Sequence, residues 1–132
     1  MKNKKTTAKK PSIVLIDNKE CSAMILEHKE IKNKFNVLPA HSVEEGINLI
    51  FSKKPDLVIS DVVVPGGDIF GILEKMKINP QTKDIPVVAL TTLCSAEDQR
   101  EVKKSGACDY LLKHECSPQH LAKKIKAIIK KQ

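Results

Sequence analysis

The sequence predicts one α/β domain, in which helices cover both faces of a five-stranded parallel sheet. Short apolar runs recur five times, starting near residues 13, 35, 57, 86 and 108. Continuous runs of this kind are typical of strands buried on both faces. Segments with helical spacing of apolar residues separate the runs, and such alternation favours a parallel sheet with right-handed crossovers. The length of 132 residues suits a single domain.

The expected strands consist mainly of Ile, Val and Leu, because aromatic residues make up only 3% of the chain. Residues of this kind fit a strand that packs on both faces. The five runs are PSIVLID (11–17), KFNVLPA (34–40), DLVIS (56–60), IPVVALTT (85–92) and ACDYLLK (107–113).

The first three expected helices follow from apolar spacing and from one capping box. The first is marked by Cys21, Met24, Ile25 and His28. Ser42 and Glu45 form a capping box that opens the second helix, and Pro55 prevents its continuation. The third is marked by Ile69, Ile72, Leu73 and Met76.

Capping residues bound the last two expected helices. The fourth begins near Ser95 and ends near Gly106, a residue type favoured at helix C-termini. The fifth opens at Ser117, with Pro118 in its first turn. Its apolar stripe consists of Leu121, Ile125, Ile128 and Ile129.

The formal charge of +7 is concentrated at the two ends of the chain. Residues 1–10 and 118–132 each hold five lysines and no acid. We interpret residues 1–10 as a flexible basic tail and the second group as a solvated helix face. A nucleic-acid partner is not favoured, because few aromatic residues are present to stack on bases.

No apolar run reaches the roughly 20 residues of a membrane span, and the N-terminus lacks the apolar stretch of a secretory signal. We expect a cytoplasmic protein whose four cysteines are reduced thiols. The segment HECSPQH brings His114, Cys116 and His120 close together, but this spacing matches no standard zinc site.

Polar residues follow four of the predicted strands at their carboxyl ends. They are Asp17 and Asn18, Asp61, Thr91 and Thr92, and Lys113. With strand order 2-1-3-4-5, the first, third and fourth strands are neighbours, so these side chains should converge. Ligands of open α/β sheets bind at such a point.

The chain resembles the response-regulator receiver domain of two-component signalling, which has a doubly wound, flavodoxin-like fold. The resemblance rests on IVLIDN, VISDVVVPGGD, IPVVALTT and GACDYLLK at the spacing of the family, and it covers residues 12 to about 130. It implies a receiver domain over residues 11–132. Since no output domain follows, we expect a stand-alone regulator similar to those of chemotaxis.

The resemblance also implies a role for each polar residue. Asp61 is the expected phosphoacceptor, Thr91 binds a phosphoryl oxygen, and Lys113 pairs with the acceptor and its phosphate. The expected Mg²⁺ ligands are Asp17, Asn18, Asp61 and the backbone carbonyl of Val63. Thr91 and Tyr110 match the pair that switches conformation after phosphorylation.

The implied function is a phosphoryl acceptor in a phosphorelay and not a turnover enzyme. A histidine kinase or phosphotransfer protein would supply the phosphoryl group, and a downstream protein would receive the signal. The alternative is a pseudo-receiver that binds proteins without phosphorylation. A flavin carrier of related topology is disfavoured, because DNKECS after the first strand lacks a phosphate cradle.

The first departure from the family pattern is Asn18, which stands where a second acid is usual. Asn supplies an oxygen but no charge, and the affinity of hard cations follows ligand charge. We therefore expect weaker Mg²⁺ binding and more metal-demanding phosphorylation. One carboxylate fewer also lessens repulsion within the site, and we leave open whether this shifts the resting state toward the active form.

A second departure is His114, which replaces a common proline after Lys113. A cis bond before a non-proline residue costs roughly 2.5–4 kcal/mol. We therefore expect a trans peptide, which leaves the direction of Lys113 open.

Further departures lie around the rim of the expected site. Thr92 should narrow the entry of a phosphodonor. Val63 and Leu93 are apolar and should obstruct the hydrolytic water, which predicts a long-lived phosphate. Ile69 stands where glycine is frequent, so the start of the third helix is expected to differ.

Overall fold

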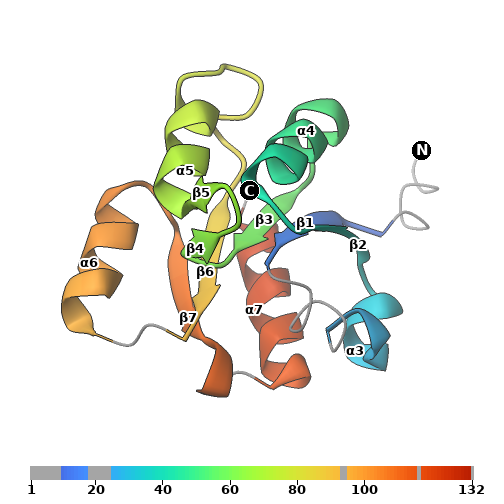
Figure 1. The fold of residues 1–132 in the computed structure, drawn as a ribbon. Helices are drawn as coiled ribbons and strands as arrows, with labels where there is room; N and C mark the ends of the chain where they lie inside the picture. Colours follow the sequence, from blue (N-terminus) through green and yellow to red (C-terminus); the bar gives the residue numbers. More distant parts are fainter. Residues whose placement is uncertain (1–9, 18–24, 93–94, 116, 132) are drawn as a thin grey trace.

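The computed structural model describes residues 10–17, 25–92, 95–115 and 117–131. Its main sheet has five parallel strands in the order β2-β1-β3-β6-β7, which confirms the predicted order 2-1-3-4-5 (Figure 1). The strands are β1 (Ser12–Ile16), β2 (Asn36–Ala40), β3 (Leu57–Ser60), β6 (Val87–Thr91) and β7 (Asp109–Leu112).

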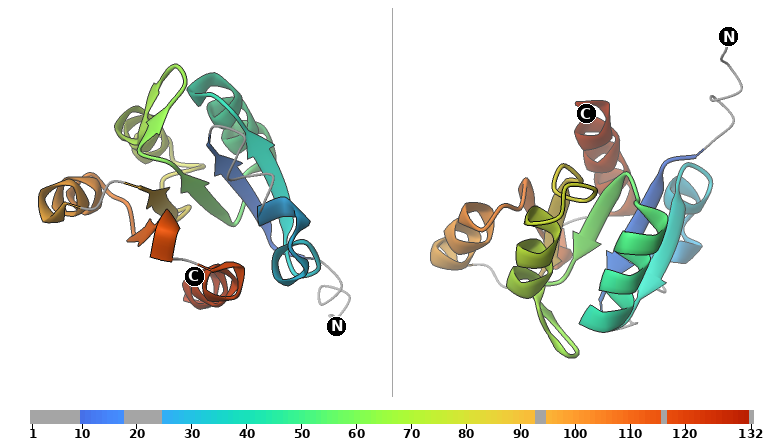
Figure 2. Two further views of the ribbon diagram at one scale, coloured as in Figure 1. Left: turned by 60° about the horizontal axis from the view of Figure 1, so that its bottom comes forward. Right: turned by 90° about the horizontal axis from the view of Figure 1, so that it is seen from above.

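Helices cover both faces of this sheet, as predicted. Figure 2 shows α3 (Lys29–Lys32) and α7 (Pro118–Lys130) on one side of it, and α4 (Val43–Lys53) and α5 (Ile69–Lys77) on the other. The strand residues divide alternately between two cores: Val14, Val58 and Val87 face one, while Ile13, Leu57 and Val88 face the other. Val102 of α6 (Ala96–Lys104) joins the first core. Burial on both faces explains why the strands are continuous apolar runs.

The predicted capping residues begin the helices of the structure. Ser42 Oγ accepts a hydrogen bond from the Glu45 amide at 3.1 Å, and the Glu45 carboxylate accepts one from the His41 amide at 2.8 Å. The Glu45 side chain thus bonds to the amide of His41, the residue before the cap Ser42. Ser95 and Ser117 cap α6 and α7 in the same way.

The first predicted helix is interrupted at His28, which was expected to lie within it. Residues 25–27 are helical, His28 is extended (ψ 132°), and α3 begins at the next residue. The His28 ring accepts a hydrogen bond from the Glu30 amide at 3.2 Å, so it caps a new helix. Cys21 and Met24 lie outside the described residues.

A small antiparallel hairpin follows Asp61 and was not predicted. It consists of β4 (Val63–Val64) and β5 (Gly67–Asp68). The strand β3 ends at Ser60, before the hairpin, and Pro65 lies in the hairpin turn. Gly66 allows this turn, because its φ of 91° is unfavourable for other residues. The Val43 amide donates to the Pro65 carbonyl at 2.9 Å, which fixes the hairpin to α4.

Only Lys10 of the predicted basic tail is described, and its ammonium donates to the Lys32 carbonyl at 3.2 Å. The assignment of residues 1–10 as a flexible tail stays a prediction. Within the described ranges, none of the helices combines the length and the apolar character that crossing a bilayer requires.

Cys108 provides a test of local electrostatics. This thiol is free and exposed, but partial burial and the Asp109 charge raise its pKa. A higher pKa lowers the thiolate fraction at neutral pH.

In a chain with the other cysteines replaced by Ser, we expect Cys108 to be alkylated more slowly at pH 7 than a free cysteine peptide. The rate should rise toward alkaline pH. Asp109→Asn should move this profile to lower pH, and an unchanged profile would contradict the assigned cause.

Candidate functional site at the carboxyl edge of the sheet

Two carboxylates lie side by side where β1 and β3 end. Ile16 and Ser60 are partners in the parallel register, so the next residues, Asp17 and Asp61, emerge at the same edge. The Asp61 amide donates to the Ile16 carbonyl at 3.0 Å and extends the ladder by one bond. The register therefore places these two acids next to each other at one edge of the sheet.

Asp61 is held by contacts to both carboxylate oxygens. Oδ2 accepts a hydrogen bond from Lys113 Nζ at 2.9 Å, and Oδ1 accepts one from the Val62 amide at 2.7 Å. The Asp61 and Lys113 side chains are each 16% exposed. Partial exclusion of water strengthens this ion pair relative to a surface pair. The carboxylate is therefore oriented and still accessible.

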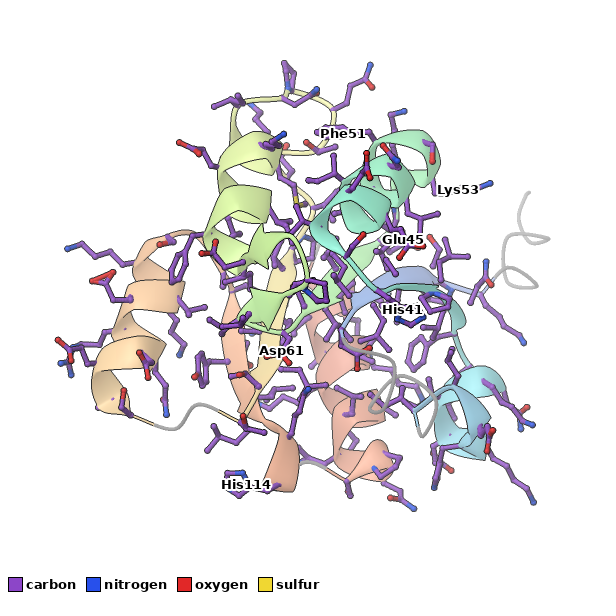
Figure 3. All side chains as sticks on the ribbon, in the orientation of Figure 1. His41, Glu45, Phe51, Lys53, Asp61 and His114 are labelled. Atoms are coloured by element: carbon purple, nitrogen blue, oxygen red, sulfur yellow. The ribbon has the colours of Figure 1, made fainter. Side chains whose placement is uncertain are left out.

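Lys113 reaches Asp61 although a trans peptide follows it. No cis bond occurs among the described residues, so the Lys113–His114 peptide is trans as expected. A short 3₁₀ helix, Lys113–Glu115, follows β7 directly. Figure 3 shows His114 well apart from Asp61. The substitution of proline by His114 therefore does not turn Lys113 out of the site.

Thr91 and Tyr110 lie on neighbouring strands and the same face. Tyr110 is opposite Ala89 in the register, and Thr91 follows Ala89 by two residues. Since side chains two residues apart in a strand point to the same face, Thr91 and Tyr110 are diagonal neighbours. Both are buried, at 1% and 8% exposure. Thr91 ends β6, next to the strand that Asp61 follows.

The described donors of the expected metal site are all oxygens. Asp17 is buried and adjacent to Asp61, while Asn18 lies outside the described residues. Carboxylate and carbonyl oxygens suit a hard cation such as Mg²⁺, and two adjacent carboxylates repel each other without one. Among the described residues, no three His, Cys, Asp or Glu side chains gather as a metal site. The described residues that could hold a hard cation are thus the two acids Asp17 and Asp61, with the Val63 carbonyl.

His41 borders this site, although sequence reasoning did not include it. Its Nδ1 lies 3.3 Å from the Asp17 carbonyl oxygen. A carbonyl only accepts, so this contact requires a proton on Nδ1. His41 directly follows β2, and that position at a carboxyl edge was the available sequence clue.

The residues that depart from the family pattern around the site differ in how exposed they are to solvent. The Val63 side chain is 69% exposed, and Thr92 is exposed, while Leu93 lies outside the described residues. Ile69 is fully buried, and its amide donates to the Val62 carbonyl at 2.9 Å. The start of α5 is thereby tied to the loop that follows Asp61.

Comparison with known proteins agrees with this geometry. The family model of the response regulator receiver domain matches residues 13–126. The chain is 33% identical over 101 residues to the response regulator PleD of Caulobacter vibrioides, and 33% identical over 100 residues to the phosphate regulon transcriptional regulatory protein PhoB of Escherichia coli. Each match covers 76% of this chain, but 22% of PleD and 43% of PhoB. The chain thus spans less than half the length of these relatives.

Solved structures give the same likeness over a larger share of the chain. A two-component response regulator from Clostridium difficile superposes with a TM-score of 0.80 and 26% identity. That match covers 92% of this chain and 97% of the other.

Proposed function

Because this chain belongs to the family of response regulator receiver domains, we propose that Asp61 accepts a phosphoryl group from a histidine kinase or a phosphotransfer protein. An Asp61 carboxylate oxygen attacks the phosphorus, and the bond between phosphorus and the donor breaks. The donor's leaving group keeps the electron pair, and an acyl phosphate forms. The observation that carries this proposal is the contact of Asp61 with Lys113 beside the second carboxylate, Asp17.

Each surrounding residue has a proposed task in this transfer. Receiver domains generally bind Mg²⁺ at their acidic phosphorylation site. Here Asp17, Asn18, Asp61 and the Val63 carbonyl would hold the ion, which neutralises charge on the phosphoryl oxygens. Lys113 balances the negative charge of the acceptor, and the Thr91 hydroxyl binds a phosphoryl oxygen. Asn18 supplies no charge, so we propose weakened Mg²⁺ affinity.

The signal would leave the site through Thr91 and Tyr110. A phosphoryl group draws the Thr91 hydroxyl toward it, and its diagonal neighbour Tyr110 changes rotamer. A downstream protein then binds the altered surface. Exposed apolar Val63 at the rim favours a long-lived phosphate, because it hinders the hydrolytic water. We also propose a cytoplasmic location, where a free thiol such as Cys108 stays reduced.

The test is intact-mass spectrometry of the full chain with Mg²⁺ and acetyl phosphate. We expect a gain of about 80 Da, the mass of one phosphoryl group. The extent should rise with Mg²⁺ and saturate only at high concentration, because Asn18 weakens the site. No gain at any Mg²⁺ concentration would support the alternative, a pseudo-receiver that binds proteins without phosphorylation.

A further inference from the structure

A basic cleft lies at the amino-terminal edge of the sheet, at the opposite end of the strands from Asp61. Its volume is about 800 Å³. The residues that matter for its chemistry are Lys10, Lys32, Lys53, Lys54, Asp56 and Phe35. Lys53 ends α4, and Figure 3 shows its side chain far from Asp61 and directed away from the molecule. The cleft is therefore separate from the phosphoacceptor site.

The positive charge of the basic cleft is not balanced by its own residues. Within the described ranges, none of its four lysines forms a salt bridge. The Lys10 and Lys54 ammonium groups donate to the backbone carbonyls of Lys32 and Phe51, each at 3.2 Å, and these are neutral partners. The carboxylate of Asp56 accepts a hydrogen bond from the Ser12 amide at 2.8 Å. The cleft therefore has four lysine ammonium groups and a single carboxylate, that of Asp56.

An apolar hollow of about 230 Å³ adjoins the basic cleft, and Phe35 lines both. Pro11 and Ile129 supply its apolar wall, and Lys126 and Lys130 stand at its edge. The neighbouring Lys34 ammonium repels Lys126 and lowers its pKa, and Glu30, which pairs with Lys34 at 3.0 Å, offsets part of this repulsion. An anionic ligand beside these lysines would relieve that repulsion.

We propose that the basic cleft and the apolar hollow together bind an acidic segment of a partner protein. Carboxylates of that segment lie among the lysines of the cleft, and one apolar side chain enters the hollow. This combination distinguishes the site from a nucleic-acid surface, because Phe35 is 3% exposed and has no free face for a base. The surface lies away from Thr91 and Tyr110, so binding here does not depend on phosphorylation of Asp61.

The test measures binding of the full chain to a fluorescent peptide with three glutamates followed by one leucine. The variant Lys32→Glu/Lys53→Glu should bind about tenfold or more weakly, since charge contacts determine the affinity. Lys103→Glu/Lys104→Glu, on α6, carries the same charge change at another exposed place. This matched control should keep the wild-type affinity within about twofold. Equal losses in both variants would overturn the proposal, as would no binding of the peptide to wild type.

Two further comparisons separate the proposed segment from other anions. Replacing the leucine of the peptide by serine should weaken binding severalfold, because the apolar hollow then stays unfilled. A peptide without leucine that binds equally well, or duplex DNA of equal charge that binds more tightly, would contradict the proposal. Both double variants should fold as wild type by circular dichroism. Lys32→Glu/Lys53→Glu should also take up a phosphoryl group normally, so failure here and failure at Asp61 are distinguishable.

Discussion

Replacing Asp61 by Asn is expected to abolish phosphoryl uptake from acetyl phosphate. The amide is a far weaker nucleophile than the carboxylate, and the ion pair with Lys113 is lost at the same time. The shape of the side chain is kept, and its remaining oxygen can still accept from the Val62 amide. Intact-mass spectrometry with saturating Mg²⁺ should therefore show a mass gain of about 80 Da in the wild-type protein and no mass gain in the variant.

Asp68→Asn is the matched control, because it makes the same change in the same connection between β3 and α5. Asp68 is exposed and caps α5 through a 3.1 Å hydrogen bond from the Gly71 amide. Asn is an equally good capping residue, so this variant should fold and take up the phosphoryl group as wild type does. Uptake that persists in Asp61→Asn would place the acceptor elsewhere. A loss of phosphoryl uptake in Asp68→Asn would show that uptake depends on the structure of the loop and not on the Asp61 carboxylate alone.

The pairing of Asp61 with Lys113, 52 residues apart, was implied by the resemblance, but the direction of the Lys113 side chain was left open by the sequence. Buried parallel strands leave few possible topologies, and each strand then delivers its following residue to a common edge. The same logic places Asp17 beside Asp61, since both continue strands in direct register. These predictions depend on the order of strands, which the apolar runs and the rules of chain connection restrict to a few possibilities.

Three features of the structure could not be predicted from the sequence in the same way. The break at His28 results from one ring that accepts an amide, which competes with continuation of the helix. The β4–β5 hairpin depends on a contact between Pro65 and Val43, which are distant in sequence. The basic cleft gathers lysines from separate elements, and their spacing along the chain shows no pattern. The break at His28 is thus a local capping effect, whereas tertiary contacts decide the hairpin and the cleft.

The substitutions Gly46→Ala and Gly71→Ala are expected to change stability in opposite directions, although both lie within helices. At Gly46 a Cβ atom would lie 2.5 Å from Ile16 Cδ1 and 2.9 Å from Cγ1, and Ile16 is fully buried. Overpacking of this kind typically costs 1–3 kcal/mol, against a helix gain of about 1 kcal/mol. At Gly71 the nearest atom, Asp68 Oδ1, is 4.0 Å away. Urea unfolding should therefore show Gly46→Ala destabilised and Gly71→Ala stabilised by up to about 1 kcal/mol.

The double variant Gly46→Ala/Ile16→Val tests whether the clash with Ile16 is the cause. Valine lacks Cδ1, the atom that the new methyl group approaches most closely. Ile16→Val alone should cost about 0.5–1.5 kcal/mol, but it should cost less, or stabilise, when Ala occupies position 46. A coupling of roughly 1 kcal/mol is expected from two residues in contact. Strict additivity would mean that the destabilisation has another origin. Because the Ile16 carbonyl accepts the Asp61 amide, phosphoryl uptake should fall in Gly46→Ala. It should recover in part in the double variant, since valine keeps Cγ1 at 2.9 Å from the new methyl group.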